Sequence, residues 1–259
     1  MDVVTIRASS LPDLLDCPAR WEARNLLGMR MPSSPAALIG TAVHAGSAAY
    51  DVARKAGTPI TLNDAASVAR DAVEHPAEEV DWRNDAHTPK GATDLAGTLT
   101  GAYVAQLADT MTFVSIEEQL PAATLRVQDV NITLTGHVDR IRIDESGTVG
   151  IIDVKTGKKI NAATHRAQLG VYRTLATLAK PELSINGADE IIAISTSQGT
   201  VERIQLPGNA MDLLVGSEGK SGLLHHVATI VKGEAFYGNP RSQLCSEKYC
   251  PRHGVCSYR

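Results

Sequence analysis

The chain has 259 residues, of which 43% are hydrophobic and 21% charged, and its formal net charge is −4. This length and hydrophobic content suit a single domain, 1–259, with a substantial core. The acidic balance argues mildly against a protein that binds nucleic acid, because such proteins more often have a basic footprint. A metal-dependent nuclease escapes this argument, since divalent cations held by its own carboxylates supply positive charge where phosphate docks.

No apolar run approaches the roughly 18 residues that a membrane span needs, so no membrane contact is expected. Segment 1–20 lacks a basic region followed by an apolar one, and it therefore predicts no secretory signal and a cytoplasmic location. In that compartment the four cysteines are more often metal ligands or free thiols than disulfides.

The first 111 residues predict a mainly helical part. Helices are expected over 11–27, 41–55, 62–80 and 91–111. Ser9 and Ser10 are positioned to cap the first of them. The polar stretch 81–91 is predicted to be a loop.

From Met111 onward the pattern favours strands, and 112–207 is predicted to be the core of the domain. Strands are expected over 112–120, 124–135, 137–144, 149–154, 189–195 and 201–206, with a helix over 162–179. Pro121 and Gly136 are predicted to break the first three strands. A helix over 209–232 opens the C-terminal part, 208–259. This order predicts an α/β fold with a mixed central sheet, an N-terminal helical elaboration and a C-terminal cysteine lobe.

Two acidic positions and a lysine suggest a catalytic centre. Asp153 and Lys155 are two residues apart on one predicted strand, so their side chains share a face. Together with Asp139, Asp153 offers carboxylates for Mg²⁺ or Mn²⁺, and Lys155 offers a cation for the charge that develops on a phosphate. The Val154 carbonyl reaches the same ion only if the strand twists or bulges. The alternative is a weak surface ion pair, but the apolar 151–152 before it indicates a buried strand, where such charges are costly.

Other polar residues are candidates for the same site. Gln168 and Tyr172 lie one turn apart on a predicted helix, and they can orient the lysine or a DNA phosphate. The alternative is that Tyr172 belongs to the core and Gln168 faces solvent. His44 can add an imidazole ligand, although a lone histidine is more often structural. Glu117 or Glu118 is a further candidate for an acid that supports the site.

The cysteines divide into one near the start of the chain, Cys17, and three near its end, Cys245, Cys250 and Cys256. This distribution makes sense if the two ends meet and share a metal centre. Four thiolates suit a [4Fe–4S] cluster or tetrahedral zinc. Zinc sites commonly have C-x₂-C pairs, which this chain lacks, but His253 could replace a cysteine in a zinc site. The remaining alternative is four unrelated free thiols.

In this order, the motifs resemble the RecB-type branch of the PD-(D/E)xK nuclease superfamily, in particular its iron–sulfur-containing CRISPR-associated, phage and AddB-type exonucleases. The resemblance covers nearly the whole chain. It is carried by Ser9 to Trp21 with its Cys17, by Gly40-Thr41-Ala42-Val43-His44, by Gly136-His137-Val138-Asp139-Arg140, by Ile152-Asp153-Val154-Lys155-Thr156-Gly157 and by Gln168-Leu169-Gly170-Val171-Tyr172. The C-x₄-C-x₅-C tail departs from the tighter C-x₂-C pair of many relatives.

The resemblance implies a restriction-endonuclease-like core and a metal-dependent DNA exonuclease of bacteria or phage-infected cells. It assigns roles to eleven residues: metal ligation to His44, Asp139, Asp153 and the Val154 carbonyl, catalysis to Lys155, DNA contact and support of the site to Gln168 and Tyr172, and a [4Fe–4S] cluster to Cys17, Cys245, Cys250 and Cys256. Single-stranded or frayed DNA ends are the implied substrate. Proteins of recombination or CRISPR adaptation are the implied partners.

Two alternatives stay open at this stage. The first is a non-catalytic subunit with the same fold that binds DNA ends or serves CRISPR adaptation. The intact Asp153, Lys155 and His44 argue against it. The second is a sequence-specific restriction endonuclease, and the absence of a recognisable recognition domain in the sequence counts against that.

Overall fold

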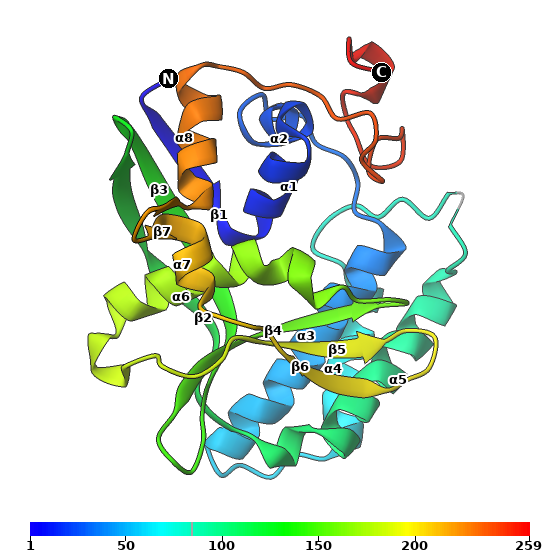
Figure 1. Cartoon of the computed structure of the whole chain (residues 1–259). Helices are drawn as coiled ribbons and strands as arrows, with labels where there is room; N and C mark the ends of the chain where they lie inside the picture. Colours follow the sequence, from blue (N-terminus) through cyan, green and yellow to red (C-terminus); the bar gives the residue numbers. More distant parts are fainter. Residues whose placement is uncertain (84) are drawn as a thin grey trace.

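The computed structural model describes residues 1–83 and 85–259, and a six-stranded mixed sheet lies at its centre (Figure 1). The strands are β1 Val3–Arg7, β2 Thr112–Val127, β3 Val130–Ile143, β4 Val149–Gly157, β5 Glu190–Ser195 and β6 Val201–Gln205. Their order is β1-β3-β4-β5-β6, and β2 pairs with β3 as a long hairpin. The pairs β1–β3 and β4–β5 are parallel and the others antiparallel. The predicted α/β fold with a mixed sheet is confirmed.

Helices cover both faces of this sheet. They are α1 Leu11–Asp16, α2 Pro18–Asn25, α3 Pro35–Lys55, α4 Leu62–Glu74, α5 Pro89–Gln106, α6 Arg166–Ala179, α7 Ala210–Val215 and α8 Leu223–Lys232. Hydroxyl side chains define where the first long helices begin: Ser34, Thr61 and Thr88 each accept a hydrogen bond from a backbone N–H of the first turn of α3, α4 and α5.

Each face of the sheet has its own hydrophobic core. One contains residues of β1, α1, α6, α7 and α8, and the other contains residues of α3, α4 and α5 (Figure 1). Strand β4 contributes to both, because Ile151 points into the first core while Ile152 and Val154 point into the second. The apolar run that precedes the Asp-Val-Lys triplet therefore belongs to a strand buried on both sides.

The N-terminal segment differs from the prediction in two ways. Val3–Arg7 forms strand β1, which the sequence did not predict, and every second residue of it is buried. The single helix expected over 11–27 is two helices, because Cys17 leaves the helical conformation with φ −147° and ψ 89°. Pro18 explains the break, since a proline ring disfavours the helical conformation of the residue before it.

The hairpin of β2 and β3 is longer than predicted, and the breaks expected at Pro121 and Gly136 were wrong. Pro121 is accommodated where the register shifts between Leu120 and Ala123. The chain reverses instead at Gln128 and Asp129, whose φ values of 47° and 66° are those of a primed turn.

The prediction of one helix over 209–232 was also wrong, because a small hairpin, β7 Gly216–Ser217 and β8 Lys220–Ser221, separates α7 from α8. Gly216 has φ +98°, which permits this turn but not a continuous helix. In the predicted loop 81–91, Asn84 lies outside the described residues. Within the described ranges, no helix is both long and apolar enough to cross a membrane.

Candidate active site and cysteine cavity

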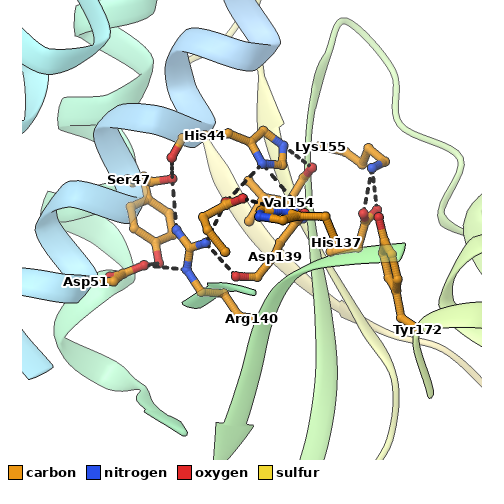
Figure 2. A network of polar contacts seen from close by, with 12 residues as sticks. His44, Ser47, Asp51, His137, Asp139, Arg140, Val154, Lys155 and Tyr172 are labelled. Carbon is orange, nitrogen blue, oxygen red and sulfur yellow. Dashed lines mark hydrogen bonds and ion pairs between the residues drawn. The ribbon is translucent and has the colours of Figure 1, made fainter. Parts of the chain in front are cut away.

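The candidate site lies where β3 and β4 separate. Their pairing extends only as far as Arg140 and Ile152, so the next part of β4 has unpaired backbone groups on that edge. Side chains form hydrogen bonds with these backbone groups instead. The Val154 N–H donates to Asp139 Oδ2 at 2.7 Å, and His44 Nε2 lies 2.9 Å from the Val154 carbonyl oxygen. Figure 2 shows His44, Asp139 and Val154 around this gap.

Helix α3 delivers His44 to the gap because Gly40, one turn earlier, lies close to β4. A Cβ added at Gly40 would be 3.3 Å from Thr156 Oγ1, so a larger residue would press on the strand. The motif Gly40–His44 therefore packs on the motif Ile152–Gly157, with Gly40 against Thr156.

Glu117 completes a compact group with His44 and Asp139. Strand register puts it directly opposite Asp139, since its neighbours Ile116 and Glu118 pair with Arg140 and Val138. One ligand atom from each of these three residues lies within 4.8 Å of the other two. Two carboxylates facing each other across strands are mutually repulsive, which a bound cation would relieve.

The sequence had suggested Glu117 or Glu118 only as a supporting acid, and the structure separates the two. Glu118 lies 2.9 Å from Lys180. Glu117 has φ +46°, and its Oε1 lies 3.5 Å from His44 Nδ1. The alternation of side chains along β2 places Glu117 and Glu118 on opposite faces. Which of them faces the site depends on the register of β2 against β3, and the sequence of β2 alone does not give that register.

The carboxylates of Asp139 and Glu117 give this group an excess of negative charge. Burial lowers the pKa of His44, but the neighbouring Asp139 and Glu117 outweigh it, and the net pKa is raised. Burial raises the pKa of Glu117, but His44 and Arg140 outweigh it, and the net pKa is lowered. The carboxylates therefore favour a positively charged neighbour.

Asp153 and Lys155 lie beside this group, on the same face of β4 as predicted. Lys155 Nζ is 2.7 Å from Asp153 Oδ1 and 2.6 Å from Oδ2. Asp153 is fully buried, and burial together with the charge of Asp139 raises its pKa to about 6 although Lys155 opposes the change. Asp153 is not part of the compact group of three.

Helix α6 supports Asp153 from the other side. Gln168 Nε2 lies 3.0 Å from Asp153 Oδ1 and 2.8 Å from the Tyr172 hydroxyl, and both Gln168 and Tyr172 are buried. Gly136 allows this approach, because a Cβ there would lie 3.0 Å from the ring of Tyr172. Burial raises the pKa of Tyr172, so its hydroxyl is neutral.

The four cysteines line one cavity, where the C-terminal tail meets α1 and α2. Figure 1 shows this tail returning to the N-terminal helices. All four thiols are free. Burial raises the pKa of the Cys250 thiol, and the neighbouring Cys17 and Cys256 raise it further.

Polar contacts attach the tail to the helices around this cavity. Arg20 is buried, and it donates to Asp13 at 2.6 Å, to Asp16 at 2.8 Å and to Ser242 of the tail at 3.0 Å. The Asn239 N–H donates to Cys17 Sγ at 3.4 Å. The break in the helix at Cys17 thus orients its thiol toward the returning tail.

Comparison with known proteins identifies the family. A model of the PD-(D/E)XK nuclease superfamily matches residues 5–257. Among solved structures, the crystal structure of SSO0001 is similar, with a TM-score of 0.44 and 14% identity over 98% of this chain and 85% of that one. No curated protein matches the chain. Because the family match extends over nearly all of the sequence, the chain belongs to the PD-(D/E)XK nuclease superfamily.

Proposed function

We propose that the protein is a metal-dependent exonuclease that hydrolyses phosphodiester bonds at single-stranded or frayed DNA ends, and that it carries a structural [4Fe–4S] cluster. The observation that carries the catalytic part is the convergence of His44, Glu117 and Asp139 at the gap between β3 and β4, beside the Asp153–Lys155 pair. Family membership supports the reaction class.

The residues at the gap fit a divalent ion such as Mg²⁺ or Mn²⁺. His44, Asp139, Asp153 and the Val154 carbonyl would hold it, and Glu117 is close enough to join them. His44 faces both parts of this set, since its Nε2 lies 2.9 Å from the Val154 oxygen and its Nδ1 lies 3.5 Å from Glu117 Oε1 and 3.6 Å from Asp139 Oδ2. When bound, such an ion lowers the pKa of a water molecule and stabilises charge on the phosphate.

The protein's own side chains supply the rest of the chemistry. Both carboxylate oxygens of Asp153 hold the ammonium group of Lys155. Lys155 is 23% exposed, so it can donate to a phosphate oxygen or to the attacking water at the mouth of the site. Gln168 fixes the carboxylate of Asp153 by donating to it.

Linear and circular DNA distinguish the proposed activity from its alternatives. With Mn²⁺, we expect the protein to degrade an end-labelled linear single strand to short products and to leave circular single-stranded DNA intact; EDTA should stop the reaction. Cleavage of the circle would indicate an endonuclease. Retention of linear DNA in a gel without any cleavage would favour a non-catalytic subunit that binds DNA ends.

We favour a cluster over zinc in the cysteine cavity. All four cysteines line this cavity, and the chain lacks the C-x₂-C pairs that zinc sites commonly have. Four thiolates are a common ligand set of a [4Fe–4S] cluster. Anaerobically purified protein should be brown with iron bound; colourless protein with stoichiometric zinc would contradict the cluster.

A further inference from the structure

Arg140 lies at the centre of the candidate site, although neither the metal set nor the catalytic pair includes it. Its side chain is completely buried. Four of its five N–H donors are used: Nε donates to Asp51 Oδ2 at 2.7 Å, Nη1 to Glu117 Oε1 at 2.9 Å and to the Asp139 carbonyl at 2.7 Å, and Nη2 to Ser47 Oγ at 3.2 Å. Figure 2 shows Arg140 between Asp51, Ser47 and the strand that carries Asp139.

These partners connect Arg140 to each element that supplies the compact group. Ser47 and Asp51 lie on the same face of α3 as His44, one and two turns further along. Ser47 Oγ donates to the His44 carbonyl at 3.1 Å, so a continuous chain of hydrogen bonds runs from Arg140 to His44. Tyr103 donates to Asp51 at 2.7 Å and fixes its orientation.

We infer that Arg140 is the positioning residue of the metal site: it sets the separation between His44 on α3, Glu117 on β2 and Asp139 on β3. This inference rests on the proposed metal-dependent function. Arginine suits the role better than lysine, because its planar guanidinium directs several donors along fixed lines, whereas a lysine ammonium is a point charge on a flexible stem. Groups that orient metal ligands commonly change metal affinity 10- to 100-fold when they are removed.

A second buried arginine provides the matched control. Arg173 donates to Asp189 at 2.9 Å and to the Ile185 carbonyl at 2.8 Å, and it holds the segment before β5 against α6. It forms a buried ion pair like that of Arg140, but it contacts no member of the compact group. If the loss of a buried ion pair were enough to weaken metal binding, substitution of either arginine would raise the Kd for Mn²⁺. If positioning is what matters, only substitution of Arg140 raises it.

The test is the affinity for Mn²⁺ alone, measured from the electron paramagnetic resonance signal of the free ion in the absence of DNA. We expect Arg140→Lys to raise the Kd about 10- to 100-fold and Arg173→Lys to leave it within twofold. An unchanged Kd in Arg140→Lys would overturn the inference. If Arg140→Lys does not fold, Ser47→Ala replaces it, with an expected rise of about fivefold; an unchanged Kd there would overturn the inference as well.

Mn²⁺ binding by the wild-type protein distinguishes a failure of this inference from a failure of the proposed function. No binding of Mn²⁺ by wild-type protein, or equal binding by wild-type and His44→Ala protein, would remove the proposed metal site itself. Tight binding that depends on His44 but not on Arg140 would remove only the positioning role.

Discussion

The carboxylate of Asp139 substitutes for a missing strand partner of Val154, accepting its N–H at 2.7 Å just where β3 and β4 part. One side chain therefore both satisfies the sheet edge and contributes to the acidic group with His44 and Glu117. Asp139 therefore joins the acidic group to the strand that carries Asp153 and Lys155.

Lys155→Ala should lower the rate of DNA cleavage about 10²- to 10³-fold, because it removes a donor aimed at developing charge. The protein should stay folded, since Lys155 is partly exposed. Lys90→Ala is the control: Lys90 is 86% exposed and, among the described residues, forms an ion pair only with Asp94 on α5, so its loss should leave cleavage unchanged. Equal rates for Lys155→Ala and wild type, measured with end-labelled DNA and Mn²⁺, would refute the catalytic role.

Asp153→Asn should stabilise the metal-free protein at neutral pH. Because the pKa of Asp153 is raised from 3.8 to about 6 on folding, its contribution to the free energy of unfolding is greatest below about pH 4 and is lost as pH rises to about 6. Asparagine does not titrate, so the variant avoids that loss. We expect a gain of up to about 3 kcal/mol at pH 7.5 and almost none at pH 4.

Urea unfolding in the presence of EDTA measures this difference. The raised pKa of His44 gives wild-type stability the same direction of pH dependence, so only the difference between variant and wild type isolates Asp153. A variant that is less stable than wild type at pH 7.5 would show that burial does not govern the ionisation of Asp153.

Tyr172→Phe should reduce kcat about tenfold and change KM little, because it removes only the hydroxyl that accepts from Gln168. The ring should stay packed against Gly136, so the free energy of unfolding should fall by no more than about 1 kcal/mol. Steady-state kinetics with a single-stranded oligonucleotide test this. An unchanged kcat would show that Tyr172 is only a core residue.

Cys17→Ser and Cys250→Ser should each abolish the visible absorbance of the purified protein and expose the tail after Tyr237 to protease. The proposed centre bridges the tail to α2, so its binding energy also stabilises the fold. Ser257→Ala, beside Cys256 but with an exposed side chain, should retain both colour and protease resistance. Protease resistance equal to wild type in both cysteine variants would indicate that polar contacts such as Arg20–Ser242 and Arg252–Glu22 hold the tail without a bound centre.

Local sequence predicted the parts of the site that depend on local geometry. The two-residue period of a strand places Asp153 and Lys155 together, and one helical turn joins Gln168 to Tyr172. Glu117 could not be assigned this way, because its position depends on the register of β2 against β3 and on a positive φ.

The ion pair of Arg140 with Asp51 joins residues 89 positions apart, and no local pattern marks it. The same holds for β1, which becomes a strand only because β3 offers a parallel partner. Long-range pairing therefore limits what the sequence alone predicts here: it locates the chemistry on β4 and α6 but not the residues that hold these elements in place.

Diffraction from crystals soaked in Mn²⁺, recorded at a wavelength where manganese scatters anomalously, shows directly whether the gap between β3 and β4 binds a metal ion. We predict an anomalous peak in the gap between β3 and β4, bonded to His44 and Asp139, with Lys155 beside it. The absence of a peak in the gap, or an ion bound elsewhere, at an Mn²⁺ concentration that supports cleavage of DNA would contradict the proposed metal site.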